Sequence, residues 1–448
     1  MKQGSHGTAF PTMIRPMVSP LGQDEFAALM APLGPFEHAP RLAAAVSGGA
    51  DSLALGVLAD GWARGRGGTL LALVVDHTLR PHSAAEAKLT VDRLATLGIP
   101  ARLIRLVGLD RGPALAERAR AARYAALAAA CREAGIPHLL LGHHAADQAE
   151  TVLMRRQSQS GPAGLAAMPA IREQARLRLL RPLLPIPPAR LRATLRAAGI
   201  GWVEDPSNRD QRALRSRLRA ALNDPDGTGP ETAALYQAAR TAGLTRAMRE
   251  ADIGSILAGR AVIRPEGFAV LSPGAIDRAA LAALIQMVAG AAYPPSTEAV
   301  AQLAAAPHPA TLAGVRLMPA GRLGGGLLLV REAAAMECEV HAVPGAIWDG
   351  RFRLAAHAAP WADATIGALG ADAARLRRFS PLPAAVLQTL PAVLRGNCLA
   401  AVPHLLYPES NVCAAVPLTF SPRRPAAGAP FAAPGSLPPG GEGRSNVH

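Results

Sequence analysis

The amino-acid sequence predicts an α/β fold, in which a parallel-sheet domain is followed by a helical linker and a smaller α+β C-terminal region. The first observation is that apolar, strand-like segments alternate with helical segments between residues 42 and 157. The second is that glycines, histidines and acids cluster where several of these strands end. Ligands bind beyond the carboxyl ends of the strands in open parallel sheets, so both observations point to the same architecture.

The segments of this alternation can be assigned in order. A short helix is expected over 24–33, and the apolar run from Leu42 to Val46 predicts the first strand. Further strands over 70–76, 101–106 and 138–141 alternate with helices over 83–97, 113–134 and 147–157. Ser83, with Glu86 three residues later, has the pattern of an N-cap with a capping box. Pro113 near the first turn and Gly135 at the end are typical helix boundaries.

The rest of the chain changes in character. Loops over 161–169 and 182–188 precede a basic helix over 189–198, and 213–250 is helical with a Pro/Gly interruption at 224–230. Residues 262–332 mix short strands with two alanine-rich helices. We therefore expect an N-terminal extension (1–35), an α/β domain (36–212), a helical linker (213–260) and a C-terminal α+β region (261–420). Eleven of the 28 residues in 421–448 are Pro or Gly, which predicts a disordered tail.

Composition narrows the class of protein. Half of the 448 residues are hydrophobic, which is enough for two or three domains. The chain has no uninterrupted apolar stretch of about 18 residues, and its start lacks the apolar core of a signal peptide. The four cysteines are too scattered for a metal site or a disulfide framework. A cytoplasmic protein with no membrane partner is expected; the oligomeric state stays open, with a homodimer as one alternative.

The positive charge is concentrated in one segment. The net charge is +14, and residues 172–219 contain twelve arginines against four acidic residues. Such a segment favours binding to a polyanion such as RNA. A solvated basic face without a partner would have the same composition, so charge alone leaves both alternatives open.

Residues Ser47-Gly48-Gly49-Ala50-Asp51-Ser52 follow the first strand and are the most informative stretch of the chain. Glycines there permit positive φ, and the N–H groups at the start of the next helix would point at an anion. An ordinary Gly-rich turn is the simpler alternative. The stretch lacks the lysine of a Walker P-loop and the spacing of a dinucleotide-binding loop. Asp51 is compatible with a phosphate site only if it holds Mg²⁺ or positions a substrate.

Further polar residues fall at the same predicted edge. Asp76 and His77 end the second strand, and His143 and His144 end the fourth. Asp147 and Glu150 lie in the first turn of the following helix, where acids also occur simply as complements of the helix dipole. Zinc is disfavoured because adjacent histidines tend to point apart and no HExxH spacing occurs. A role of the carboxylates in holding Mg²⁺ and an incoming amine suits them better.

These motifs, taken in order, resemble those of the tRNA(Ile)-lysidine synthase family, within the N-type ATP pyrophosphatase (PP-loop) superfamily. The resemblance covers residues 41 to about 219, and a fainter one includes Thr311–Gly314 and Trp348–Arg351. The segments that carry it are the Ser47–Ser52 loop, Val75-Asp76-His77-x-Leu79-Arg80 with Ser83 and Glu86, Arg120-x-x-Arg123-Tyr124, His143-His144-x-x-Asp147-Gln148-x-Glu150-Thr151, Gly164-Leu165 with Met168, Arg181–Leu184 and Trp202-x-Glu204-Asp205-Pro206-Ser207-Asn208.

The resemblance implies an activity and a set of roles. A member of this family ligates L-lysine to the wobble cytidine of tRNA(Ile) with a CAU anticodon, through an adenylated tRNA, and so switches decoding from Met to Ile. ATP would be the substrate and Mg²⁺ the cofactor. The implied roles are ATP binding by Ser47, Gly48, Gly49, Ala50, Asp51, Ser52, Asp76 and His77; catalysis by Asp51, His143, Asp147 and Glu150; metal binding by Asp51 and Asp147; and tRNA binding by Arg181, Arg212, Arg215 and Arg217.

Three alternatives remain at this point. A tRNA thiolation enzyme that uses a persulfide or an iron–sulfur cluster needs paired cysteines, and the sequence has no C-x-x-C. A small-molecule amide synthetase has no use for the basic segment. A catalytically inactive tRNA-binding protein is disfavoured because Asp51, Asp147 and Glu150 are all present.

The chain departs from the family pattern at a few positions. Ala146 stands where an acid or amide is usual, Ala167 replaces the second glycine of Gly-Leu-x-Gly-Met, and Ser216 replaces an asparagine. The segment after Thr151 is also shorter than usual. These departures concern the amine pocket and leave the expected nucleotide site intact.

Overall fold

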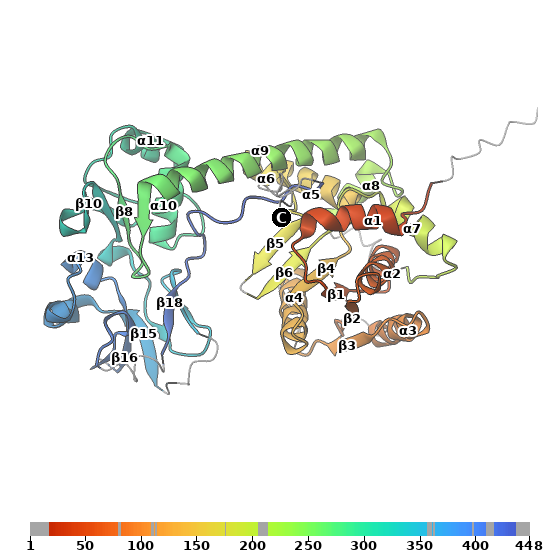
Figure 1. Ribbon diagram of the computed structural model, residues 1–448, viewed down its shortest axis with the longest axis horizontal. Helices are drawn as coiled ribbons and strands as arrows, with labels where there is room; N and C mark the ends of the chain where they lie inside the picture. Colours follow the sequence, from red (N-terminus) through yellow and green to blue (C-terminus); the bar gives the residue numbers. More distant parts are fainter. Residues whose placement is uncertain are drawn as a thin grey trace, which may run out of the picture. The chain divides into compact units, whose positions relative to one another are not determined.

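The computed structural model describes residues 18–435, apart from 79–81, 109–111, 113, 175, 205–213, 356–360, 362, 397 and 409–415. The chain forms two compact units: unit 1 comprises 1–247 and 431–448, and unit 2 comprises 248–430 (Figure 1). Within the described ranges, no helix has the length and hydropathy that crossing a bilayer requires.

Unit 1 is built on a six-stranded sheet with the strand order β3-β2-β1-β4-β6-β5. The strands are β1 (Arg41–Ala45), β2 (Thr69–Asp76), β3 (Ala101–Arg105), β4 (His138–Leu141), β5 (Ile171–Gln174) and β6 (Leu177–Leu180). All neighbouring pairs are parallel except β5–β6, which is antiparallel. The predicted parallel sheet is confirmed, and β5 and β6 extend it through a stretch for which the sequence predicted no strand.

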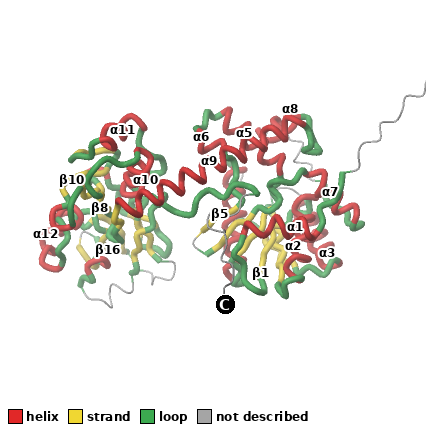
Figure 2. The backbone as a smooth tube through the Cα atoms, turned by 45° about the horizontal axis from the view of Figure 1, so that its top comes forward, coloured by secondary structure: helices red, strands yellow, loops and turns green. Residues whose placement is uncertain are grey.

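Helices cover both faces of this sheet, as the figures show (Figure 1, Figure 2). The alternation along β1 explains the layers, because Leu42 and Ala44 face one core whereas Ala43 faces the other. The first core is covered by α1 (Gln23–Met30), α2 (Ala50–Arg64), α3 (Ser83–Thr96) and α7 (Pro188–Ala197), and the second by α4 (Leu115–Glu133). The remaining helices of unit 1 are α5 (Ala145–Gln157), α6 (Pro162–Leu165), α8 (Leu214–Leu222) and the first part of α9 (Pro230–Arg260).

Several expected boundaries differ in the structure. The N-cap of α3 is His82, and Ser83 is the first helical residue, so the predicted Ser83 N-cap is wrong. The expected N-terminal extension is part of unit 1 from residue 18 onward, because Phe26 and Met30 of α1 are fully buried in its core. The boundary between the two units falls inside α9, after Ala247, rather than at the end of the expected linker.

The expected disordered tail also needs correction over its described part. Residues 421–435 are placed, with Phe431 7% and Ala433 2% exposed. These residues form no helix or strand, but the prediction of disorder missed Phe431 and Ala433, which pack in an apolar cluster of unit 1. Residues 436–448 of the expected tail lie outside the described residues.

The described residues of unit 2 form three antiparallel sheets, with strand orders β7-β8-β11-β10-β9, β12-β15-β16-β17 and β13-β14-β18. Its strands are β7 (Ala261–Ile263), β8 (Ala269–Leu271), β9 (Ala310–Leu312), β10 (Val315–Pro319), β11 (Leu327–Arg331), β12 (Val340–His341), β13 (Ile347–Trp348), β14 (Phe352–Leu354), β15 (Ala364–Ala368), β16 (Pro391–Arg395), β17 (Cys398–Ala401) and β18 (Leu418–Phe420). Its helices are α10 (Arg278–Ala289), α11 (Thr297–Ala305), α12 (Ala373–Leu376) and α13 (Ala384–Leu387). This agrees with the predicted α+β character of the region.

A buried ionic cluster connects Thr311–Gly314 with Trp348–Arg351, the two segments of unit 2 that have a faint resemblance to the family. Asp349 is 1% exposed and accepts hydrogen bonds from Arg351 at 2.7 Å and from Arg331 at 3.0 Å. Arg331 also donates to the carbonyl of Gly314 at 2.9 Å. Two buried guanidinium groups around one carboxylate make Asp349 necessary, because its loss would leave buried charge uncompensated.

Candidate active site

The loop after β1 leads directly into α2. Gly48 has φ +87°, and a Cβ at this position would collide with the hydroxyl of Thr90, so the site requires glycine. Gly49 is the N-cap of α2 and has extended backbone. The free N–H groups of the first helical turn therefore lie at the loop, where the helix dipole favours an anion.

Two hydroxyl groups hold this loop in shape. The Ser52 hydroxyl accepts a hydrogen bond from the backbone N–H of Ser47 at 3.0 Å and donates to the carbonyl of Gly49 at 3.1 Å. The hydroxyl oxygens of Ser47 and Ser52 are 3.0 Å apart. The loop conformation is thus fixed by its own side chains, as preorganised recognition of an anion requires.

The end of β4 lies against the start of α2. A Cβ added to Gly142 would lie 3.0 Å from the Cα of Ser52 and 3.2 Å from the backbone nitrogen of Ser52. Both distances are shorter than ordinary packing contacts. After β1 the chain continues to β2 on one side, whereas β4 lies on the other side of β1. The Ser47–Ser52 loop and the residues after β4 therefore meet at the topological switch point of the sheet, where open α/β sheets bind ligands.

His144 lies between two carboxylates at this point. Its Nε2 is 3.4 Å from Asp51 Oδ2 and 3.5 Å from Asp147 Oδ2, and its backbone N–H donates to Asp147 Oδ2 at 3.1 Å. Burial alone would lower the pKa of His144, but Asp147, Asp51 and Glu150 together raise that pKa to about 9. Burial would likewise raise the pKa of Asp147, but the charged His144 and the hydrogen bond from its backbone N–H reverse this effect and lower it. An imidazolium between two carboxylates is the expected charge state near neutral pH.

His143 directly precedes the charged His144 but is itself uncharged near neutral pH. Burial lowers the pKa of His143 to about 3, helped by Arg181, Arg120 and Arg215 and opposed by Asp147. Its Nδ1 is buried and has no hydrogen-bond partner among the described residues. The side chain is therefore a neutral imidazole with hydrogen-bonding capacity available to a substrate.

The buried Glu150 forms an ion pair with a half-buried arginine that the sequence analysis did not select. Its Oε1 accepts a hydrogen bond from Arg219 Nε at 2.7 Å, and the glutamate is 1% exposed. Burial raises the pKa of Glu150, although Arg219 opposes this shift. The second carboxylate oxygen, Oε2, is buried and finds no hydrogen-bond partner in the described part of the chain. It is a candidate acceptor for a substrate proton.

Asp76 closes the other side of the site at the end of β2. It is 2% exposed, and its Oδ1 accepts a hydrogen bond from the backbone N–H of Thr78 at 2.9 Å. Its Oδ2 is buried without a hydrogen-bond partner in the ranges that the structure covers.

The structure brings most of the predicted site residues to one cavity of about 1320 Å³. Gly48 lies behind it against Thr90. The predicted residues that line the cavity are Ser47, Gly49, Ala50, Asp51, Ser52, Asp76, His77, His143, Asp147, Glu150 and Arg215. The wall of the cavity also contains Tyr124, Trp202, Arg192 and Arg219, to which the sequence analysis assigned no role in the site. The spacing Arg215–Arg219 on a predicted helix was the available signal for Arg219, since residues four apart share a helix face.

The predicted tRNA-binding arginines divide into separate groups. Arg215 lines the cavity, and Arg217 is exposed on α8. Arg181 is 5% exposed and donates to the carbonyl of Pro169 at 2.8 Å, so its guanidinium does not face solvent where an RNA backbone could bind. Arg212 lies outside the described residues.

The described residues offer a magnesium ion few protein ligands. Asp51 Oδ1 is buried without a described hydrogen-bond partner, which leaves one oxygen for a cation. No group of three or more His, Cys, Asp or Glu residues that could hold a metal occurs in the ranges searched. Mg²⁺ is commonly held by one or two carboxylates together with substrate phosphates, and such an arrangement needs no third protein ligand.

Comparison with known proteins now identifies the family. A PP-loop domain model matches residues 21–225. The tRNA(Ile)-lysidine synthase of Ruegeria pomeroyi is 37% identical over 81% of this chain and 88% of its own length. The synthase of Caulobacter vibrioides is 36% identical over 82% of this chain and 87% of its own length. That of Bradyrhizobium sp. strain BTAi1 is 46% identical over 46% of this chain and 60% of its own length.

Among solved structures, the U34-tRNA thiolase NcsA from Methanococcus maripaludis matches with a TM-score of 0.42 and 17% identity, over 50% of this chain and 78% of that chain. The assignment rests on the relatives that align over most of both chains. By these relatives, the chain belongs to the tRNA(Ile)-lysidine synthase family.

Proposed function

We propose that this chain ligates L-lysine to the wobble cytidine of a tRNA(Ile) with a CAU anticodon at the expense of ATP. The observation that carries the proposal is the convergence of the Ser47–Ser52 loop with Asp51, Asp147 and Glu150 in one cavity. An anion-binding loop alone would fit many nucleotide enzymes. Carboxylates with unpartnered oxygens beside it add the means to receive a cationic amine.

The first step is adenylation of the base. The C2 carbonyl oxygen of the cytidine attacks the α-phosphorus of ATP; an oxygen–phosphorus bond forms, the bond to the bridging oxygen breaks, and pyrophosphate leaves. We propose that the N–H groups at the start of α2 and the hydroxyl of Ser47 donate to the leaving pyrophosphate, while the Ser52 hydroxyl holds the loop by donating to the carbonyl of Gly49. Donors that are fixed before the reaction stabilise charge as it develops.

The second step is displacement of AMP by the ε-amine of lysine. A carbon–nitrogen bond forms at C2 while the carbon–oxygen bond to AMP breaks. The amine must lose protons before and during this attack. Glu150, with its raised pKa and unpartnered Oε2, and the neutral His143 are the groups proposed to orient the amine and accept its protons.

Mg²⁺ is proposed as the cofactor, held by Asp51 with Asp147 as the second carboxylate. When bound, it would offset negative charge on the phosphates of ATP. Asp51 Oδ1 is the oxygen left for it, because Asp51 Oδ2 already faces His144 at 3.4 Å.

For the tRNA, we propose that Arg215 and Arg217 of α8 contact the phosphate backbone near the cavity. The exposed Arg217 and the cavity-lining Arg215 lie on the helix that also supplies Arg219 to Glu150. The target cytidine must be unstacked to reach the cavity, as is usual when proteins read bases of RNA loops. We propose a cytoplasmic location, because the substrates of the proposed reaction, tRNA and ATP, are available there.

The test is transfer of labelled lysine to the CAU-anticodon tRNA(Ile) with ATP and Mg²⁺. Incorporation that requires ATP and fails with a tRNA(Met) control is the expected result. Absence of incorporation under conditions in which ATP still binds would overturn the proposal. Release of pyrophosphate with tRNA but without lysine would further separate the adenylation step from the transfer step.

A further inference from the structure

The chain crosses between its two units twice. It leaves unit 1 within α9, after Ala247, and returns at Phe431 after completing unit 2. We call residues 431–435 the return segment. Residues 158–170, which connect α5 to β5, are called the α5–β5 loop.

The return segment is packed into unit 1. Phe431 and Ala433 form an apolar cluster with Ala166 of the α5–β5 loop and with Ala242 and Ala247 of α9. Ala166 is fully buried in this cluster. A hydrogen bond from the backbone N–H of Ala170 to the carbonyl of Ala432, at 2.8 Å, fixes the segment to the loop. The return segment therefore supports this loop.

The same cluster ties the loop to α9. The guanidinium of Arg246 lies 4.6 Å from the ring centroid of Phe431, and its Nη1 donates to the carbonyl of Ala163 at 3.1 Å. Gly243 is the contact point on α9, since a Cβ there would lie 3.0 Å from the Phe431 ring. Phe431 thus fills a position between α9 and the α5–β5 loop.

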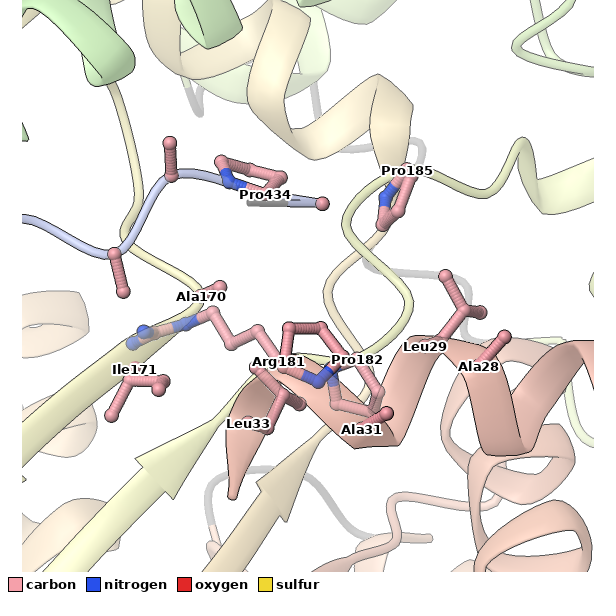
Figure 3. Close-up of a pocket in the computed structure, with 14 residues that line it drawn as sticks. Ala28, Leu29, Ala31, Leu33, Ala170, Ile171, Arg181, Pro182, Pro185 and Pro434 are labelled. Carbon is pink, nitrogen blue, oxygen red and sulfur yellow. The ribbon is translucent and has the colours of Figure 1, made fainter. Parts of the chain in front are cut away.

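The return segment also borders a second cavity of unit 1. This cavity, of about 240 Å³, lies between the end of α1, the residues after β6 and the return segment. Figure 3 shows Pro434 across the cavity from Leu29 and Pro182. Its wall is mainly apolar, so the segment here covers a core surface rather than a polar site.

The α5–β5 loop is in turn clamped to the helix that carries the catalytic carboxylates. The Gln148 side chain is fully buried, and its amide donates to the carbonyl of Met168 and accepts from the N–H of Met168, both at 2.9 Å. Gln148 follows Asp147 directly on α5 and lies two residues before Glu150. A continuous set of contacts therefore runs from Phe431 through the loop to the carboxylates.

From this arrangement we infer that the return segment is a positioning element of the reaction. It holds the α5–β5 loop against Gln148, and so fixes α5 in the orientation in which Asp147 and Glu150 face the cavity. Misplacement of a catalytic group by a fraction of an ångström lowers the rate without abolishing binding. The inference rests on the proposed ligase activity for its kinetic consequence, but its structural part can be measured independently.

The decisive variant is Gly243→Leu, whose side chain would occupy the position of Phe431. Gly259→Leu is the matched control, because Gly259 lies on the same helix with no atom within 4 Å of an added Cβ. We expect Gly243→Leu to lower kcat for lysine transfer at least about 10-fold while leaving KM for ATP within about twofold. The Ser47–Ser52 loop is unaffected by this change because it is held by its own hydrogen bonds. Gly259→Leu should retain the wild-type kcat.

Hydrogen exchange supplies the readout that does not depend on activity. In Gly243→Leu and in Phe431→Ala, the amides of Ala170 and Met168 should exchange faster, while amides of β1 and β4 keep their protection. Phe431→Leu, which keeps an apolar side chain, should restore both the exchange rates and kcat.

The outcomes separate the two proposals. If the wild-type protein lacks ligase activity but the variants show the expected changes in exchange, the proposed function is overturned and the packing role of the return segment remains. Wild-type kcat in Gly243→Leu, or unchanged exchange at Ala170 and Met168, would overturn the positioning role. A uniform loss of protection throughout unit 1 would also overturn it, since that result indicates a general stabilising contact.

Discussion

Asp51 lies in the first turn of α2, next to a loop suited to phosphate, where a carboxylate without a counter-charge would repel the substrate. One of its oxygens faces His144 at 3.4 Å, and the other is buried without a described hydrogen-bond partner. The imidazolium state of His144 accounts for the first oxygen. A cation bound with the substrate phosphates would account for the second, and this is the role proposed for Asp51.

Replacing Asp51 tests this role at the level of one residue. Asp51→Asn keeps the size of the side chain but removes its charge, so adenylation should fall by about 10²–10³-fold, the range typical of a lost charge-stabilising group. The fold should persist because the side chain is 34% exposed. The measurement is pyrophosphate release with tRNA, beside circular dichroism, and Asp92→Asn on the exposed side of α3 is the control. Wild-type turnover in Asp51→Asn would remove the residue from the site.

Ala167, a position at which the family resemblance predicts glycine, carries backbone strain. Its φ is +55°, in the left-handed region that favours glycine. Ala167→Gly should therefore be neutral or raise the free energy of unfolding by up to about 1 kcal/mol, because relief of strain offsets the added freedom of the unfolded chain.

The matched control for this prediction is Ala166→Gly, one residue away. Ala166 has φ −63° and is fully buried, so the same substitution should destabilise the protein, by about 1 kcal/mol. Chemical denaturation measures both variants. Equal losses of stability in the two would show that the left-handed conformation of Ala167 costs nothing.

At the scale of elements, α10 of unit 2 shows how a helix start can depend on one carboxylate. Asp277 is its N-cap and accepts hydrogen bonds from the N–H groups of Ala279 and Ala280 at 2.9 and 3.1 Å, while Arg249 donates to both of its oxygens. Burial would raise the pKa of Asp277, but the Arg249 and backbone hydrogen bonds lower it below 3.8.

This lowered pKa gives a prediction with a defined sign. The ionised Asp277 stabilises the fold above pH 3.8, and that contribution is lost as pH falls through its lowered folded-state pKa. Asp277→Ala should therefore lower the free energy of unfolding by about 1–2 kcal/mol near neutral pH. The difference from wild type should stay constant down to about pH 5 and shrink below pH 3.8. A difference that grows on acidification would contradict the cap assignment.

The sequence predicted the elements that carry the site better than those around it. The strand over 138–141 and the helix ending at 157 could be predicted because apolar runs, and the polar residues that bound them, are local features of the sequence. β5 and β6 were missed because Arg172 and Arg178 interrupt their short apolar patterns, and because their pairing is a tertiary property. The Ser83 N-cap failed by one residue, since helix ends depend on backbone geometry that sequence alone does not determine.

In the candidate site, too, residues with a local sequence signal could be predicted, whereas those that depend on tertiary contacts could not. Asp51, Asp147 and Glu150 could be selected because acids next to a Gly-rich loop are unusual and share one sheet edge. Arg219 could not be selected in the same way, because its pairing with Glu150 spans 69 positions of sequence. Arg181 was chosen for its charge, but only the structure shows that its guanidinium is buried against the carbonyl of Pro169.

For the whole molecule, the net charge of +14 bears directly on the proposed tRNA substrate. A protein that neutralises phosphates with arginine releases counterions from the RNA. The logarithm of its binding constant therefore falls linearly with the logarithm of the salt concentration. The affinity of this chain for tRNA(Ile) should therefore fall about 10³–10⁵-fold between about 50 and 200 mM salt if six to ten phosphates are contacted. A salt-independent affinity would contradict recognition through the basic segment.

Individual arginines should contribute unequally to the salt dependence of tRNA binding. Arg217 is exposed on α8, which also carries the cavity-lining Arg215, so Arg217→Ala should weaken tRNA binding and reduce the salt slope by about one unit. Arg132 is also exposed but lies at the end of α4, just before β4 and thus at the opposite edge of the sheet from the cavity. Arg132→Ala should leave the slope unchanged, although it removes the same charge from the molecule. Equal effects of the two substitutions would mean that net charge, rather than a defined tRNA surface near α8, determines binding.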